Sequence, residues 1–249
     1  MARLLTAGVV VLLALYATGC SKVTITVERA DAGAAQAAAS TTPAIAFATP
    51  EDAISFYLDG VAQNDAGKIL EACASAEMGE QYQAELFVER LGGVMMLQMM
   101  PAPADYPFYR DVNKAQQTAR ILAQVRNFAY ALLSDEDVAA ATPIMEVDSD
   151  RVRNFITDVD PAQLATIEVT SITSPPVPAA SKTRYSENSE RIARIYGADE
   201  YTERVVSFTY EGSDYYTGFQ LLRYGDNWKV MDQSSPFGNT SALGVPVKQ

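Results

Sequence analysis

The sequence has 249 residues and a formal net charge of −12, because 31 Asp and Glu residues outnumber 19 Lys and Arg residues. So acidic a chain has no overall electrostatic field that attracts nucleic acid or anionic lipid, which argues against a nucleic-acid-binding protein. The chain contains no histidine. This absence excludes Ser-His-Asp and Cys-His catalysis and most catalytic zinc sites, and we expect neither a metal nor a cofactor.

The first twenty residues have the composition of an export signal. Arg3 precedes an apolar run at residues 4–16, which is shorter than the roughly 20 residues needed to span a bilayer as a helix. Small residues occupy positions 17–19 and Cys20 follows them directly. This run resembles the lipobox of bacterial lipoproteins. The resemblance implies that residues 1–19 are a cleaved signal peptide and that Cys20 carries the lipid, with palmitate-like acyl chains.

Residues 20–48 are expected to form a flexible, disordered tether between the lipid and a folded domain. Residues 29–49 are small and polar, and few of them could contribute to a core. The lipid on Cys20 would hold the chain on the extracytoplasmic side of a membrane. Because Ser21 replaces the Asp that commonly retains lipoproteins in an inner membrane, we expect the outer membrane in a two-membrane cell. In a single-membrane cell we expect the outer face of the cell membrane.

Cys73 is the other of the two cysteines. Lipidation of Cys20 would leave it without a disulfide partner. It lies in an apolar helical stretch at residues 69–74 with no basic neighbour, which favours a buried structural thiol over a nucleophile.

The first half of the remaining chain has helical periodicity. Thr49 is a suitable N-cap, Pro50 suits the first helical position, and two acids follow. Apolar residues recur at three- and four-residue spacing, and prolines at 101, 103 and 107 predict a loop. The predicted helices begin near residue 50, cover about 65–74, run over 78–100 with a bend at Gly92 and Gly93, and cover 111–133; residues 151–156 form a short helix or a connector.

The last third changes to a two-residue period, which indicates strands. The polar run 181–197 is predicted to be a long loop with a short helix near 191–196. Gly225 and Asp226 form a two-residue hairpin signal. The predicted strands cover 162–173, 203–211, 215–224 and 227–232, and the last three are consecutive antiparallel neighbours.

Two segments together resemble the family of cone-shaped domains similar to nuclear transport factor two. Residues 49–65 with 69–74 resemble its opening helices, and residues 224–232, with Trp228, resemble its last hairpin. The resemblance implies an α+β fold of the cystatin-like type, with helices packed on a curved antiparallel sheet around a conical pocket. A single domain over 49–235 would then carry a helical insertion at about 78–145, followed by a partly ordered tail at 236–249.

Four residues could line or rim such a cone: Tyr57, Tyr210, Tyr216 and Asp232. No nucleophile–base pair is present in the sequence, so no residue is assigned a catalytic role. Tyrosines at such positions are more often core residues. The acids at 135–137, which follow Ser134, and the pair Asp148 and Asp150 lack the twelve-residue calcium loop, so we expect a solvated helix end.

Methionines at 95, 96, 99 and 100 lie beside the apolar segment 101–109. Methionine adapts to irregular partners, so this stretch is either a docking surface or ordinary packing of the third helix. The leading hypothesis is a lipid-anchored extracytoplasmic domain that binds a small ligand or a partner protein without catalysis. The alternatives are an isomerase or lyase that uses Asp and Tyr in the cone, and a structural role in the envelope.

Overall fold

The computed structural model describes residues 45–92, 97, 99–101, 106–134 and 149–249. The predicted signal peptide, Cys20, almost all of the tether, Met95, Met96 and the acids at 135–137 lie outside these residues. Among the described residues, the helices are α1 (Pro50–Ala62), α2 (Ala66–Glu71), α3 (Ser75–Gln81), α4 (Ala84–Leu91), α5 (Pro107–Leu133), α6 (Ser149–Asp158) and α7 (Lys182–Ile195), with short 3-10 turns η3 (Pro161–Thr166) and η4 (Ala179–Ser181).

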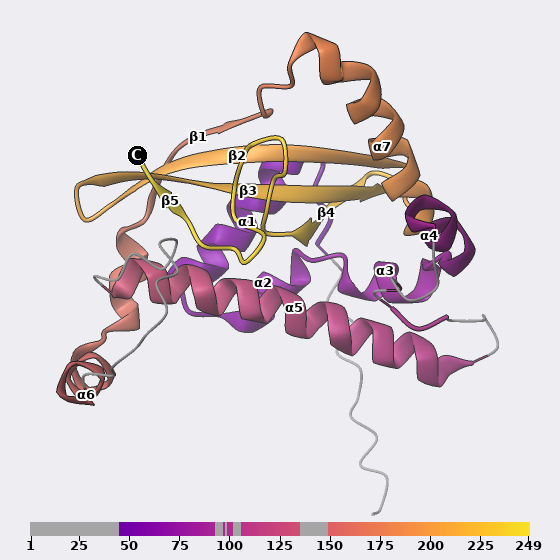
Figure 1. Cartoon of the computed structure of the whole chain (residues 1–249). Helices are drawn as coiled ribbons and strands as arrows, with labels where there is room; N and C mark the ends of the chain where they lie inside the picture. Colours follow the sequence, from indigo (N-terminus) through magenta and orange to yellow (C-terminus); the bar gives the residue numbers. More distant parts are fainter. Residues whose placement is uncertain (1–44, 93–96, 98, 102–105, 135–148) are drawn as a thin grey trace, which may run out of the picture. The chain divides into compact units, whose positions relative to one another are not determined.

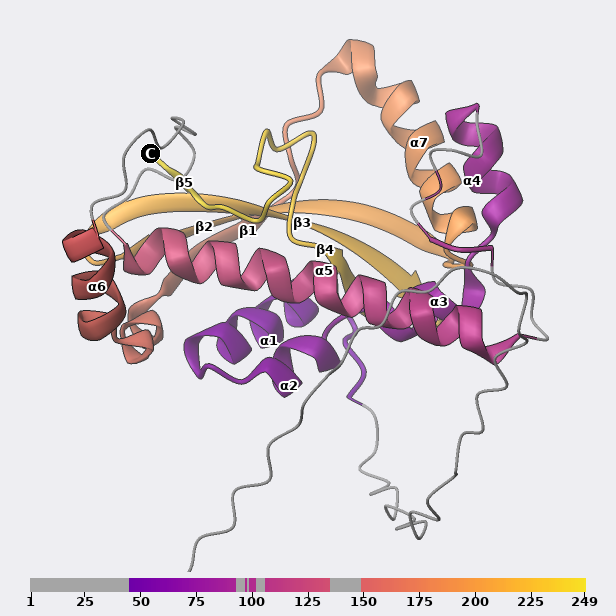
Figure 2. The ribbon, with the colours of Figure 1, turned by 60° about the horizontal axis from the view of Figure 1, so that its bottom comes forward.

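The strands form an antiparallel sheet in the order β1-β2-β3-β4. A fifth strand, β5, pairs with β3. Figures 1 and 2 both place α1, α2 and α5 on one side of the sheet and α7 on the other. The strands are β1 (Glu168–Thr173), β2 (Glu200–Tyr210), β3 (Ser213–Tyr224), β4 (Asn227–Asp232) and β5 (Val247–Lys248). The predicted α+β class, with helices packed on an antiparallel sheet, is therefore confirmed.

The start of α1 follows the sequence prediction. Thr49 is the N-cap: its Oγ1 accepts a hydrogen bond from the Asp52 backbone N–H, and the Asp52 carboxylate accepts one from the Thr49 N–H, each at 3.1 Å. This reciprocal capping box satisfies two backbone donors that the helix itself leaves unpaired. Phe47, which the sequence analysis placed in the tether, is 4% exposed and packs in the core.

Two apolar clusters fill the interior. The first lies between α1 and the sheet, with Tyr57, Phe128, Phe208 and Phe219 among its fully buried members. The second packs α3, α4 and α7 against the end of the sheet, and includes Met78, Phe87, Ile192, Leu222 and Met231. Residues that are neighbours along β3, or along β4, therefore pack into different apolar clusters.

Cys73 belongs to the first cluster, as predicted for a structural thiol. It is 3% exposed, and its Sγ donates to the Ile69 carbonyl at 3.1 Å. Burial raises the pKa of the Cys73 thiol far above its ordinary value, so the sulfur stays protonated.

Several predicted boundaries are wrong. The predicted helix over 78–100 is instead α3 and α4, because Tyr82 takes an extended backbone conformation (φ −61°, ψ 127°) between them. Pro107, which was predicted to lie in the loop, is instead the first residue of α5, since proline suits the first helical position. Residues 162–166, which were predicted to begin a strand, lie in the 3-10 turn η3, so β1 is shorter than expected.

The largest correction concerns residues 181–197, where a long loop with only a short helix near 191–196 was predicted. Residues 182–195 form α7, a helix of 14 residues. Its sequence is polar, but Ile192, Ala193 and Ile195 are buried against the second cluster. These residues dock the end of the helix, and near its start the half-buried Tyr185 packs against Phe237, with its hydroxyl accepting a hydrogen bond from the Glu203 backbone N–H at 3.3 Å.

The C-terminal segment 236–249 returns across the sheet and is held at several points. Gln124 of α5 donates to the Ala242 carbonyl at 3.0 Å, and Asn127 donates to the Leu243 carbonyl at 3.0 Å. Val247 then pairs with Tyr216 of β3. Within the described part of the chain, none of the helices combines the length and apolar character that crossing a bilayer requires.

Candidate functional site

Three of the four predicted pocket residues lie in the interior of the protein, but they line neither of the described cavities. Tyr57 and Asp232 are both 0% exposed and Tyr210 is 2% exposed. Tyr216 is half-buried and lies on the opposite face of β3 from Phe219, because successive strand residues alternate between faces. The structure therefore separates Tyr216 from Tyr57, whose ring packs against Phe219 on the other face.

Asp232, at the end of β4, has its carboxylate fully engaged. Its Oδ1 accepts hydrogen bonds from Gln124 Nε2 and from Ser234 Oγ, each at 2.7 Å. Its Oδ2 forms an ion pair with Arg120 of α5. Tyr57 does not bond Asp232; its hydroxyl donates to Gln233 Oε1 at 2.8 Å.

A second buried carboxylate, Glu203 of β2, is linked to Asp232 through side chains. Glu203 is 1% exposed, and its Oε1 accepts from the Tyr201 hydroxyl at 2.9 Å. The hydroxyl oxygen of Tyr201 lies 2.8 Å from Gln220 Oε1, and Gln220 Nε2 donates to Ser234 Oγ at 2.9 Å. Ser234 in turn donates to Asp232, so one hydrogen-bonded network joins both acids.

The tyrosines in this region are poor proton-transfer groups. Burial raises the pKa of Tyr57 well above its ordinary value, and the nearby Cys73 and Asp232 add to the effect. Burial likewise raises the pKa of Tyr201, reinforced by the charge of Glu203. A substrate must come within hydrogen-bond distance of a catalytic acid or base, and Asp232 and Tyr57 are enclosed by protein.

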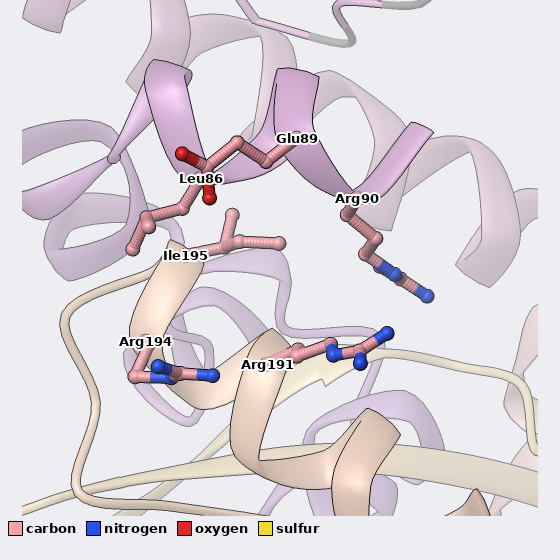
Figure 3. Close-up of a pocket in the computed structure, with 6 residues that line it drawn as sticks. All are labelled: Leu86, Glu89, Arg90, Arg191, Arg194 and Ile195. Carbon is pink, nitrogen blue, oxygen red and sulfur yellow. The ribbon is translucent and has the colours of Figure 1, made fainter. Parts of the chain in front are cut away.

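The described cavities lie elsewhere, beside α4 and α7. One has a volume of about 300 Å³ and is lined by Leu86, Glu89 and Arg90 of α4 and by Arg191, Arg194 and Ile195 of α7. In Figure 3, Arg90 extends from α4 and Arg191 from α7 toward the same space, and Arg194 of α7 lies farther from Arg90, on the side of Leu86 and Ile195. Three arginines thus line one cavity between two helices of a strongly acidic chain.

The two helices are fixed to each other by hydrogen bonds. The backbone N–H of Gln83, which precedes α4, donates to the Ile195 carbonyl at 2.7 Å. Arg90 Nη2 donates to Asn188 Oδ1 at 3.0 Å. Below the cavity, Ile195 and Ile192 are buried in the second apolar cluster. The helices that carry the three arginines are therefore held in place by hydrogen bonds and by buried apolar side chains.

A second cavity of about 200 Å³ adjoins the first, since Arg90 lines both. Its lining combines the apolar side chains of Phe87, Leu91, Ile192 and Met231 with Tyr196 and Gln220. Arg120 also borders it, but Arg120 is paired with Asp232.

Sequence reasoning did not single out these arginines. Arg191 and Arg194 are three residues apart, a spacing that puts side chains on one face of a helix. Both residues lie in the short helix that was predicted near 191–196, but two arginines on one helix face do not by themselves indicate a site. Arg90 could not be associated with them from sequence, because it is about a hundred residues earlier and joins them only through the packing of α4 on α7.

The methionine stretch and the acidic residues that the sequence analysis considered do not form a site among the described residues. Met99 is 2% exposed and packs in the second cluster. Asp150 forms an exposed ion pair with Arg153 at 2.9 Å. Across the described residues, no group of three or more His, Cys, Asp or Glu side chains is placed to hold a metal ion.

Comparison with known proteins gives little further information. No protein-family model and no curated protein matches the sequence. Among solved structures, the chain is similar to a cystatin-like protein from Ruminococcus gnavus, with a TM-score of 0.49 and 20% sequence identity. The match covers 80% of this chain and 44% of that protein, so the chain spans less than half of its length.

Proposed function

We propose that this chain is a lipid-anchored extracytoplasmic domain that binds a small ligand without transforming it. The anchor rests on the sequence alone: the apolar run at 4–16, the small residues at 17–19 and Cys20. Binding without catalysis rests on one structural observation. The acid and tyrosine that could serve as catalytic groups, Asp232 and Tyr57, are enclosed and hydrogen-bonded, whereas the described cavities lie at α4 and α7 and are lined by neither of them.

The anchor is tested by replacing Cys20 with alanine. The substitution removes the only atom that can take the diacylglycerol, so we expect an unprocessed precursor and no incorporation of labelled palmitate. The matched control is Cys73→Ala, which should be processed and labelled normally. Labelling of the Cys20→Ala protein would contradict the assignment.

The binding function is tested by native mass spectrometry of the mature chain purified from its envelope. We expect a small molecule bound with one-to-one stoichiometry, and Leu86→Trp should displace it because the indole would fill the larger cavity. Glu85→Trp, on the exposed part of the same helix, is the control and should keep the ligand. A wild-type chain recovered empty, or a ligand retained in Leu86→Trp, would contradict a ligand site between α4 and α7.

The runner-up, an isomerase or lyase that uses Asp232 and Tyr57, makes a different prediction for the same sample. Such an enzyme would convert the recovered ligand, and Asp232→Asn or Tyr57→Phe would abolish the conversion. We expect the wild-type chain to leave the ligand unchanged in mass and in exchange of its carbon-bound hydrogens with deuterated water.

A further inference from the structure

The larger cavity has a positive charge that the chain itself does not neutralise. Its lining contributes Arg90, Arg191 and Arg194 against Glu89, a formal balance of +2 in a chain whose net charge is −12. Like charges that converge in a partly enclosed space repel one another, and a bound anion removes that repulsion. The lining therefore favours a ligand with two negative charges.

The three guanidinium groups keep most of their donors free. Arg90 uses one nitrogen for the neutral side chain of Asn188. Arg191 and Arg194 are exposed, and neither makes an ion pair with any residue in the described ranges. Each guanidinium can therefore give two parallel N–H bonds to a carboxylate or a phosphate.

The arrangement of the donors favours phosphate over carboxylate. Arg90 comes from α4, while Arg191 and Arg194 come from α7, so the donors approach one space from separate sides (Figure 3). A tetrahedral phosphate has three terminal oxygens to distribute among such donors, whereas a planar carboxylate has two. A phosphate monoester is also close to a dianion at neutral pH, which matches the charge of the lining.

The rest of the ligand would contact apolar surface. Leu86 and Ile195 line the cavity beside the arginines, and past Arg90 the second cavity offers Phe87, Ile192 and Met231. The two volumes, about 300 and 200 Å³, are in the size range of small-molecule sites. We propose that the cavity between α4 and α7 binds a soluble phosphate monoester with an apolar organic group, its phosphate held by Arg90, Arg191 and Arg194; this rests on the binding function proposed above and names its ligand class.

The test is calorimetric titration of the full mature chain with phenyl phosphate. We expect saturable one-to-one binding, with inorganic phosphate weaker because it lacks the ring. Benzoate has the same ring but a planar carboxylate with a single charge, and it should bind at least about tenfold more weakly than phenyl phosphate. Benzoate binding as tightly as phenyl phosphate would overturn the assignment of phosphate.

A pair of double variants on α7 locates the site. Arg191→Gln with Arg194→Gln removes two cavity charges and should weaken phenyl phosphate binding by at least about tenfold. Lys182→Gln with Arg184→Gln removes the same charge from exposed positions of the same helix outside the cavity, and should change the affinity less than about twofold. Equal weakening in both variants would show that only the overall charge matters, and would overturn the site. Thermal unfolding of both variants checks that α7 remains folded.

Three further outcomes separate this proposal from others. Binding to phosphatidylcholine vesicles that contain phosphatidic acid, without any response to phenyl phosphate, would overturn the soluble ligand in favour of a lipid headgroup. If phenyl phosphate fails but Leu86→Trp still displaces the co-purified molecule, the binding function stands and only the ligand class falls. If the ester binds and releases inorganic phosphate, the ligand class stands and the non-catalytic function fails.

Discussion

At the scale of single residues, Glu51 shows how one contact between distant segments stabilises the fold. Its Oε1 accepts a hydrogen bond from Arg204 Nε at 2.6 Å, which ties the first turn of α1 to β2. Burial opposes the charge on Glu51, but the hydrogen bond and the positive charge of Arg204 outweigh it, and the pKa of Glu51 is lowered. The negative charge also lies at the positive end of the helix dipole.

Glu51→Gln should therefore reduce stability in a pH-dependent way. A lowered pKa in the folded state gives stability that is fully present above the unfolded value, about 4.3, and is lost as pH falls through the folded pKa. Because Glu51 is partly exposed, we expect the variant to lose no more than about 1 kcal/mol of unfolding free energy at pH 7. Urea unfolding at pH 7 and at pH 3 measures the difference, which should shrink at the lower pH.

The control for this prediction is Glu71→Gln at the end of α2. Glu71 is exposed and has no ion pair among the described side chains, so its substitution should leave stability nearly unchanged at both pH values. A Glu51→Gln deficit of the same size at pH 3 would show that the contribution is packing and not charge.

Residue-level prediction from sequence succeeded where local rules suffice. The capping box of Thr49 and Asp52 depends only on residues three apart, and burial of Cys73 follows from its apolar helical neighbours. The enclosure of Asp232 could not be predicted, because its partners Gln124 and Arg120 come from α5, over a hundred residues away.

At the scale of elements, the C-terminal segment depends on the absence of a side chain at Gly218 of β3. A Cβ there would lie 2.5 Å from the Ser235 backbone nitrogen and would also overlap Thr240 Oγ1. Real Cβ atoms essentially never approach a backbone nitrogen so closely, so either the strand or the segment after β4 would have to move. The close approach lets the segment lie flat on the sheet.

Gly218→Ala should therefore displace residues 235–240 and destabilise the domain by about 1–3 kcal/mol, as overpacking does in other interiors. Hydrogen–deuterium exchange should rise in residues 236–249 more than in α1. Gly67→Ala is the control, because a methyl there meets only the side-chain oxygen of Asp65, at 3.2 Å. Unchanged exchange in 236–249 would mean that this segment does not depend on the contact with Gly218.

Prediction of helices and strands from sequence failed mainly where tertiary packing, and not the local sequence, determines the secondary structure. Residues 182–195 lack an apolar stripe along their full length, yet α7 is stable because its last turn docks into the second cluster. The turn between β3 and β4 at Gly225 and Asp226 depends on local sequence and was predicted correctly, whereas the turn between β2 and β3 lies at Glu211 and Gly212, between strands predicted to end at 211 and begin at 215. The arginine cavity was not predicted, because it depends on the packing of α4 against α7.

At the scale of the whole domain, the two apolar clusters share strands. Leu221 and Leu222 are neighbours on β3, but Leu221 packs in the first cluster and Leu222 in the second. On β4, Val230 and Met231 divide in the same way. Neither cluster can lose its packing without disturbing strands on which the other depends. The domain should therefore unfold as one cooperative unit.

Leu222→Ala tests this coupling with a reporter in the other cluster. Trp228 is the single tryptophan and packs in the first cluster. Removing the fully buried Leu222 side chain should lower the free energy of unfolding by about 2–5 kcal/mol. The urea midpoints measured by tryptophan fluorescence and by far-UV circular dichroism should shift together, as they should for Leu221→Ala.

Val169→Ala, at an exposed position of β1, is the control and should shift neither midpoint much. A fluorescence midpoint unchanged by Leu222→Ala, with a shifted dichroism midpoint, would show that the α4–α7 end unfolds independently, and the ligand cavity would then lie on a separately stable part of the domain.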